Sequence, residues 1–218
     1  MGAPSTFSKE IYDLIKARRD VRDEFLPTAI PEQILMRLLD AAHHAPSVGF
    51  QQPWNFIVVR DEARRKRIQS VFAKAKNEEA NIFNDERQTL YHALKLEGII
   101  RAPVNLVVTC NKKRDGEKGL GRFHNPQMSV YSCVCAVQNL WLAARAENIG
   151  VGWVSIYHEP ALRKILKLPD HIEIIAYLCL GYVSYFYDQP ELQKKGWRQR
   201  LPLEQLIFEE HWQSSALE

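Results

Sequence analysis

The amino-acid sequence predicts a single domain of the α+β class that spans residues 1–218. Two observations lead to this prediction. Segments with helical and strand-like patterns follow one another without strict alternation, which disfavours a doubly wound parallel sheet. In addition, 46% of the residues are hydrophobic, which in a chain of 218 residues is enough to bury one core. No repeat or linker divides the sequence.

Two helices are expected near the N-terminus. The first covers residues 8–16, with Ser8 suited to be its N-cap. The second begins near Pro31, a good first-turn residue, and should end before Pro46, because a residue that precedes proline avoids the helical conformation. Its apolar positions recur at helical spacing: Ile34, Leu35, Leu38, Leu39 and Ala42.

A short apolar strand over residues 56–59 precedes a charged helix over residues 62–76. The basic run at 64–67 is expected to form the solvated face of that helix. Residues 77–97 are polar and helix-prone, and they contain few strong core residues. A loosely packed segment of this kind is suited to cover a binding site, so we expect residues 77–97 to act as a lid.

The second half of the chain holds the most apolar segments. Residues 104–110 are expected to form a buried strand, and residues 152–156 and 174–183 two more. Residues 128–146 are apolar on nearly every face, which is typical of a helix buried on all sides. In a protein of this size, the pattern predicts a central helix at a subunit interface.

The composition disfavours several functional classes. A net charge of +3 gives no support for binding nucleic acid. No apolar run is long enough to cross a bilayer, and no secretory leader is recognisable. Neither the histidines nor the cysteines have metal-ligand spacing, so no metal is expected. The cysteines all lie in apolar segments and are expected to be buried, reduced thiols of a cytoplasmic protein: Cys110, Cys133, Cys135 and Cys179.

The first candidate site is Arg-Arg-Asp-Val-Arg at residues 18–22. Arg18 and Arg22 are four residues apart, so a helical or near-helical turn would direct both guanidinium groups the same way. Convergent guanidinium groups suit a phosphate or a carboxylate. The alternative is a solvated, charged helix end.

Two loops are further candidates. Residues 45–55 contain two prolines, a glycine and several side-chain amides, so they could hold polar groups rigidly against a planar heterocycle. Alternatively, this loop is only a connection, with Trp54 filling the core. Gly150 and Gly152 would let the backbone approach a ligand closely, or else form a tight turn from a helix to a strand.

The last candidate is the basic segment at residues 194–200. It is either a second phosphate-binding element or a solvent-facing stretch. A short helix is expected to begin at Pro202, followed by an aromatic tail.

Taken in order, these motifs resemble those of the FMN-dependent nitroreductase superfamily. The matching features are an Arg-Arg-x-x-Arg start, an Ala-Pro-Ser…Gln-Pro-Trp-x-Phe loop, a Gly-x-Gly motif before a strand and a C-terminal Arg-x-Arg. Each motif is weak by itself, whereas their order and spacing are specific. The resemblance covers nearly the whole chain.

The resemblance implies a nitroreductase-like fold, in which a mixed central sheet is surrounded by helices and FMN lies at a homodimer interface. It also implies that the tail at residues 202–218 wraps around the partner, and that Ser47 and Gly49 line the flavin ring. The positions that match FMN contacts of the family are Arg18, Arg19, Asp20, Val21, Arg22, Pro46, Ser47, Gly49, Val154, Ser155, Arg198 and Arg200.

Within the superfamily, the chain is similar to a branch of enzymes that fragment reduced FMN with oxygen and release 5,6-dimethylbenzimidazole, the lower ligand of cobalamin. The residues that carry this likeness are 18–22, 43–50, 52–56, 124–128 and 150–155. Ordinary nitroreductases usually carry a small hydroxyl residue where this chain has Asp20. Asp20 and Ser155 match the two catalytic positions of the branch.

The likeness implies a role for each of these two residues. A carboxylate near the first ribityl carbon can act as a general base, and we expect the neighbouring arginines to keep Asp20 ionised. We expect Ser155 to orient Asp20 through a hydrogen bond. Reduced FMN would be the substrate and oxygen the co-substrate, and a separate flavin reductase would supply the reduced FMN. No nucleic acid or membrane partner is expected.

Two alternatives stay open from the sequence. One is an NAD(P)H-dependent nitroreductase or flavin reductase, which would use the same fold with FMN as a cofactor. The other is a non-catalytic flavin-binding protein, which would need the phosphate contacts but not an ionised Asp20.

Overall fold

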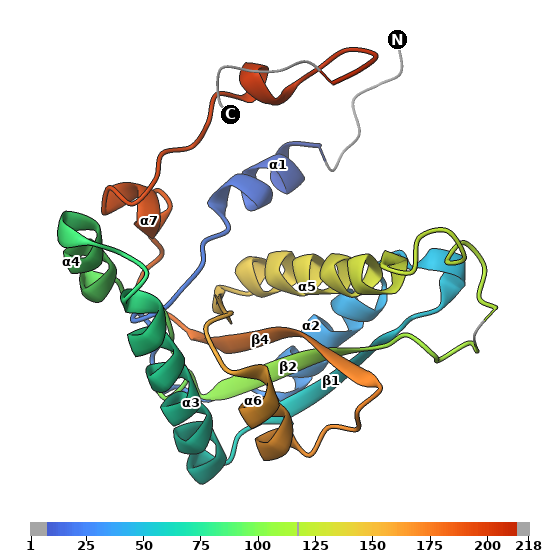
Figure 1. Ribbon diagram of the computed structural model, residues 1–218, viewed down its shortest axis with the longest axis horizontal. Helices are drawn as coiled ribbons and strands as arrows, with labels where there is room; N and C mark the ends of the chain where they lie inside the picture. The colour runs from blue at the N-terminus through green and yellow to red at the C-terminus, as the bar shows by residue number, and fades with distance from the viewer. Residues whose placement is uncertain (1–7, 117, 213–218) are drawn as a thin grey trace.

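The computed structural model describes residues 8–116 and 118–212. Its centre is a four-stranded sheet with the strand order β1-β2-β4-β3, in which all three neighbouring pairs are antiparallel (Figure 1). Within the described residues, parallel pairing is confined to a single bridge between Asp20 and Val151. The strands are β1 (Trp54–Val59), β2 (Val104–Asn111), β3 (Ile149–Val154) and β4 (Ile172–Tyr182).

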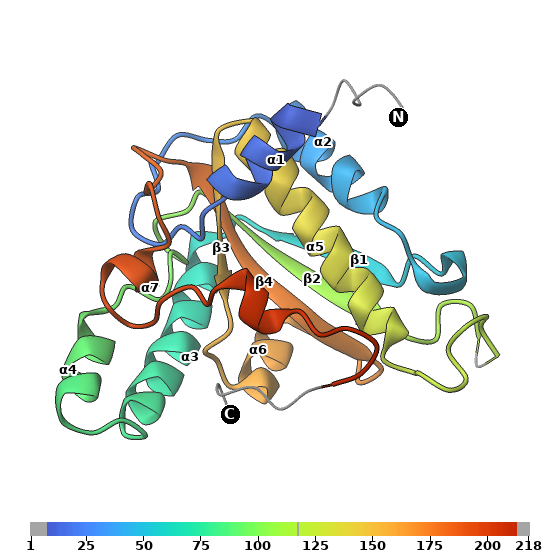
Figure 2. The same ribbon diagram turned by 90° about the horizontal axis from the view of Figure 1, so that it is seen from above.

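Helices cover both faces of this sheet, and α1 lies over α5 on the outside (Figures 1 and 2). The α-helices are α1 (Ser8–Ala17), α2 (Glu32–His43), α3 (Glu62–Ala80), α4 (Asp85–Ala93), α5 (Met128–Ala146), α6 (Glu159–Leu166) and α7 (Glu191–Lys194). Two 3-10 turns complete the chain, η1 (Val48–Phe50) and η2 (Leu203–Leu206).

The sheet divides the core into two layers. Strand β2 is buried along nearly its whole length, so its alternate side chains enter different layers. Leu106 and Val108 pack with α2 and α5, whereas Val107 packs with α3 and α6 on the other face. Both layers are needed to bury the sheet, which explains why β2 and β4 are nearly continuous apolar runs.

The helix predicted over residues 128–146 is present with the same bounds as α5. Its inner side chains, such as Leu140, are fully buried, but Tyr131, Val134 and Cys135 are exposed in this chain. The expectation that all four cysteines are buried is therefore wrong for Cys135, because that residue lies on the outer face of α5. Such an exposed apolar face fits the predicted subunit interface.

The expected solvated face at residues 64–67 also needs a correction. Arg65 donates hydrogen bonds to the carbonyl oxygens of Ile100 and Ala102, at 3.1 and 2.6 Å. It therefore ties α3 to the turn that leads into β2.

Residues 77–97 contain the end of α3, all of α4 and a short extended segment. They pack more tightly than their composition indicates, because Tyr91 and Leu94 are each only 2% exposed. The role of this segment as a lid stays a prediction. None of the helices that the structure describes is long and apolar enough to span a membrane.

Candidate active site

The segment that follows α1 lies along the free edge of β3. The N–H of Val21 donates to the carbonyl oxygen of Val151 at 3.0 Å, next to the bridge between Asp20 and Val151. Such close packing requires glycine in β3, because a Cβ atom at Gly152 would lie 2.0 Å from the carbonyl oxygen of Val21. Gly150 and Gly152 lie inside β3 rather than in a turn before it. The segment that approaches them closely is the one that contains Val21, not a ligand.

This packing fixes the carboxylate of Asp20. Its Oδ1 atom accepts a hydrogen bond from the N–H of Trp153 at 3.0 Å. The guanidinium group of Arg22 forms an ion pair with both carboxylate oxygens and also donates to the carbonyl oxygen of Trp153 at 3.0 Å. Arg22 thereby joins Asp20 to the end of β3.

The sequence prediction that Arg18 and Arg22 share a helical turn is wrong. Helix α1 ends at Ala17, and the next residues are extended, so the two guanidinium groups have different partners. Arg22 binds Asp20, whereas Arg18 stacks over the ring of Trp141 on α5, 4.7 Å from its centroid. Trp141 also donates through Nε1 to the carbonyl oxygen of Arg19 at 3.1 Å, so α5 fixes this segment from the other side.

The direction of the shift in the pKa of Asp20 also differs from expectation. Removal of the carboxylate from bulk water raises its pKa above the ordinary 3.8, and the charge and hydrogen bonds of Arg22 only partly oppose this shift. The arginines therefore do not lower the pKa of Asp20 overall. Many protein atoms surround the carboxylate, but 42% of its side-chain surface stays accessible where it lines the cavity, so a substrate there can reach it.

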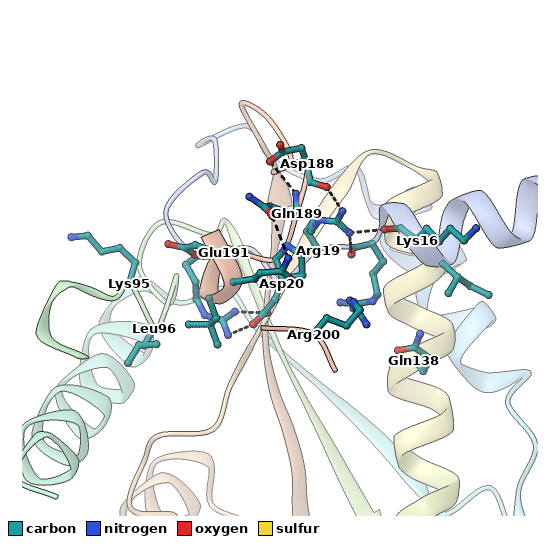
Figure 3. A pocket seen from close by; sticks show the side chains of 16 residues that line it. Lys16, Arg19, Asp20, Lys95, Leu96, Gln138, Asp188, Gln189, Glu191 and Arg200 are labelled. Carbon is teal, nitrogen blue, oxygen red and sulfur yellow. Dashed lines mark hydrogen bonds and ion pairs between the residues drawn. The ribbon is translucent and has the colours of Figure 1, made fainter. Parts of the chain in front are cut away.

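Asp20 lies on the wall of a cavity of about 780 Å³, a size typical of sites for small molecules. Figure 3 shows Asp20 near the centre, with Lys95 and Leu96 on one side and Gln138 of α5 on the other. The remaining walls come from the end of α1, from residues 188–193 and from Arg200.

Positive charge is concentrated on one side of this cavity. Burial lowers the pKa of the Arg19 guanidinium, and the charges of Arg18 and Arg200 lower it further. The Nε atom of Arg19 is buried and has no hydrogen-bond partner in the described structure. The terminal nitrogens of Arg19 donate to the carbonyl oxygens of Lys16 and Arg18, at 2.6 and 2.7 Å, and to that of Asp188, so this arginine is held in place by the backbone. An anion in the cavity would offset the repulsion among the three arginines, so the residues fit a phosphate group.

The structure thus brings five of the predicted site residues to one cavity, and the others lie elsewhere. The five are Arg18, Arg19, Asp20, Arg22 and Arg200. Val21 and Val154 are buried in the hydrophobic core and do not line the cavity. Arg198 lines a groove beside η2 that adjoins the cavity and shares Arg200 with it. Ser155 is exposed just after β3, and Asp20 takes its orientation from Trp153 and Arg22 instead of Ser155.

Pro46, Ser47 and Gly49 form a second cluster around η1. The N–H of Val48 donates to the hydroxyl of Ser132 on α5 at 3.1 Å. Ser132 and Trp141 are about two and a half helical turns apart, so they point to opposite faces of α5. The η1 cluster therefore does not line the cavity of its own chain. Trp54, by contrast, fills the core as the structural alternative proposed.

Sequence reasoning missed several residues of the cavity. Trp153 acts through its backbone, which no sequence motif reveals. Gln138 is a polar residue within the apolar run of α5, and this is a weak signal. Lys95 and Leu96 reach the cavity only because α4 folds back, and nothing local to them predicts it.

Comparison with known proteins defines the class. The model of the nitroreductase family matches residues 15–182. This match covers more than half of the chain, so the chain belongs to the nitroreductase family. The fold agrees: a solved iodotyrosine deiodinase bound to FMN and 3-iodo-L-tyrosine superposes with a TM-score of 0.73, although only 21% of residues are identical. That superposition covers 93% of this chain and 100% of the other.

Two curated relatives are more similar in sequence. The 5,6-dimethylbenzimidazole synthase of Rhodospirillum rubrum is 42% identical over 189 residues, which are 87% of this chain and 89% of that protein. The 5,6-dimethylbenzimidazole synthase of Rhodobacter capsulatus is 35% identical over 204 residues, which are 94% and 98% of the two chains.

Proposed function

We propose that this protein catalyses the oxygen-dependent fragmentation of reduced FMN to 5,6-dimethylbenzimidazole and erythrose 4-phosphate. The observation that carries the proposal is the carboxylate of Asp20, held by Arg22 and Trp153 on the wall of a cavity with an arginine-rich side. The identity to two 5,6-dimethylbenzimidazole synthases supports the same reaction.

The arginines are proposed to orient the substrate. Arg19 and Arg200 would hold the phosphate of FMN, since both line the cavity and an anion between them would offset the repulsion that lowers the pKa of Arg19. Arg18 is fixed beside them by its stacking on Trp141. Reduced FMN supplies the ring and the ribityl chain that react with oxygen.

Asp20 is proposed to accept a proton from the ribityl chain. A carboxylate offers about four lone pairs, and three are used here: two on Oδ1 by Trp153 and Arg22, and one on Oδ2 by Arg22. One lone pair on Oδ2 is therefore left for the substrate. General base catalysis by such a group contributes roughly 10²–10⁴-fold to a rate.

Ser155 stays in the proposal with a changed role. Because Asp20 is held by Arg22 and Trp153 and not by a hydrogen bond from Ser155, we propose that the hydroxyl of Ser155 acts on the substrate directly. Its exposed place at the end of β3 leaves the side chain free to do so.

A homodimer would complete the site. Pro46, Ser47 and Gly49 lie on the opposite face of α5 from the cavity, so they can line a flavin ring only in the cavity of a second copy. The exposed face of α5 would form the interface, and the tail at residues 202–218 would wrap around the partner; its residues 213–218 lie outside the described structure. We further propose a cytoplasmic location, where a separate flavin reductase supplies reduced FMN.

The test is to mix the purified protein with chemically reduced FMN in air and to analyse the small molecules by chromatography with mass detection. A 5,6-dimethylbenzimidazole peak is the expected result. Quantitative recovery of oxidised FMN, beside an active synthase as positive control, would reject the proposal. Steady oxidation of NAD(P)H with intact FMN would instead favour a nitroreductase or flavin reductase.

A further inference from the structure

Trp197 does not line the candidate cavity, but it is linked by the chain or by ring contacts to two segments that do. The segment 188–193 and Arg200 form one wall, and Lys95 and Leu96 form another. Trp197 follows the first segment along the chain, whereas its ring packs against α4, which precedes Lys95. It therefore connects two parts of the cavity that are about 100 residues apart in sequence.

The backbone directs Trp197 to this place. Helix α7 ends at Lys194, and Gly196 adopts a left-handed conformation with φ of 76°. The N–H of Gly196 donates to the carbonyl oxygen of Gln193 at 3.1 Å, and the N–H of Trp197 donates to that of Leu192 at 2.8 Å. This is a glycine-based helix cap, which turns the chain sharply and fixes the residue after the glycine.

The side chain of Trp197 then makes three contacts with α4 and the turn before it. Its ring meets Phe83 edge to face, with centroids 5.3 Å apart, and lies 6.2 Å from the ring of Tyr91. The guanidinium group of Arg87 stacks over it at 4.2 Å. We call this group of four residues the aromatic clamp.

Both ends of the clamp are close to the cavity. Arg200 follows Trp197 by three residues, a span of at most about 11 Å. Lys95 follows Tyr91 by four residues, and this short connection is fixed because Leu94 is buried and its carbonyl oxygen accepts from Lys76 Nζ at 3.1 Å. We therefore expect a substitution in the aromatic clamp to displace Arg200 on one wall and Lys95 on the other.

We propose that Trp197 is a positioning residue for flavin binding, which holds α4 over the cavity and keeps Arg200 directed at the phosphate. This inference rests on the proposed function for the identity of the ligand. It gives the basic segment 194–200 a role beyond direct contact with the phosphate. It also identifies Trp197 as the residue that anchors the predicted lid.

The experiment compares the affinities of full-length variants for oxidised FMN and for riboflavin, which lacks the phosphate, by quenching of flavin fluorescence. Trp197→Ala is expected to weaken FMN binding roughly tenfold more than riboflavin binding, because a charged hydrogen bond to the phosphate is lost. Trp197→Phe should restore most of the preference for FMN. Met36→Ala, which truncates an exposed side chain on α2, is the control and should leave both affinities unchanged.

A double-mutant cycle separates positioning from a general loss of structure. In an Arg200→Ala background, Trp197→Ala should add little further loss of FMN affinity, because its effect acts through Arg200. If Trp197→Ala does not fold, Phe83→Leu loosens the clamp from the other side and should give the same selective loss. Additive effects of Trp197→Ala and Arg200→Ala, or equal losses for FMN and riboflavin, would overturn the inference.

The outcomes also separate this inference from the proposed function. A wild-type protein that prefers FMN but yields no 5,6-dimethylbenzimidazole would reject the reaction and leave the clamp intact. A productive enzyme whose preference for FMN is unaffected by Trp197→Ala would reject the clamp alone. A wild-type protein without any preference for FMN over riboflavin would overturn the clamp as stated.

Discussion

A Cβ atom added to Gly152 would lie 2.0 Å from the carbonyl oxygen of Val21. This close approach joins the free edge of β3 to the segment that carries the candidate base. Because real Cβ atoms do not approach a carbonyl oxygen this closely, the spacing between β3 and residues 20–22 depends on a missing side chain. The position of Asp20 is therefore encoded in part by a residue that does not touch the substrate.

We expect Gly152→Ala to push Val21 away from β3 and to displace Asp20 and Arg22 with it. A shift of about 1 Å at a reacting group can cost 10²-fold in rate, so 5,6-dimethylbenzimidazole formation should fall by about that factor. The measurement is product yield from reduced FMN in air, with circular dichroism to show that the fold persists. Met36→Ala, which truncates an exposed side chain on α2, is the control. An unchanged yield for Gly152→Ala would contradict this account.

Asp20→Asn tests the base directly. The amide is nearly isosteric with the carboxylate, so FMN binding should be retained, whereas product formation should fall by roughly 10²–10⁴-fold. Flavin titration measures the first quantity and chromatography the second. Full product yield in this variant would remove Asp20 from the mechanism.

The raised pKa of Asp20 predicts the pH dependence of activity. A general base must be deprotonated, so product formation should decline as the pH falls through a value above the ordinary 3.8. Arg22→Gln removes the charge that opposes this rise, so the acidic limb should move to higher pH. Rates measured across pH in both proteins test the prediction, and a limb that moves to lower pH in Arg22→Gln would contradict it.

The raised pKa of Asp20 also makes the free energy of unfolding depend on pH. A carboxyl group whose folded pKa is raised binds its proton more tightly in the folded than in the unfolded chain. The contribution of Asp20 to the free energy of unfolding is therefore fully present below the pKa of the unfolded chain, near 3.8. It is lost as the pH rises through the pKa of Asp20 in the folded protein. The stability of the wild type relative to Asp20→Asn should therefore fall as the pH rises from below 3.8 through the folded pKa of Asp20. Denaturant titrations of both proteins across this pH range test the sign, and a relative stability that rises with pH would contradict the raised pKa.

Tyr91 offers a test of the core beneath α4. Its hydroxyl group is buried without a hydrogen-bond partner, and burial raises its pKa to about 12. Tyr91→Phe removes an unsatisfied polar group and should leave the free energy of unfolding unchanged or raise it by about 1–2 kcal/mol. Tyr91→Ala should lower it by about 3–5 kcal/mol through the cavity left behind. A large loss in Tyr91→Phe would mean that the hydroxyl group has a partner in solution.

Subunit complementation tests the composite site. Homodimers of Asp20→Asn and of Gly49→Leu should each be inactive, the second because a bulky side chain would crowd the flavin of the partner and the contact with Leu120. In a mixture of the two chains, heterodimers keep one intact site, which should restore about a quarter of wild-type activity. No recovery, with heterodimers demonstrated by mass spectrometry, would place both residues in one site of the same chain.

The sequence by itself determined the elements and the family. The apolar run of α5, the breaks at Pro31 and Pro46 and the strand patterns are local properties, so the helices and strands could be predicted within a few residues. The candidate base and the arginines could also be recognised, because the order of the motifs along the chain can be read without knowing the fold.

Only the tertiary structure decided how those residues interact. Arg22 and Arg18 have different partners because the chain after α1 runs along β3, and Asp20 is held by Arg22 and by the backbone N–H of Trp153 rather than by Ser155. Asp20 has a raised rather than a lowered pKa because burial outweighs the nearby charge. Burial, hydrogen-bond geometry and the packing of α4 against Trp197 are sums over contacts between distant segments, and a pattern of residues along one segment does not contain them.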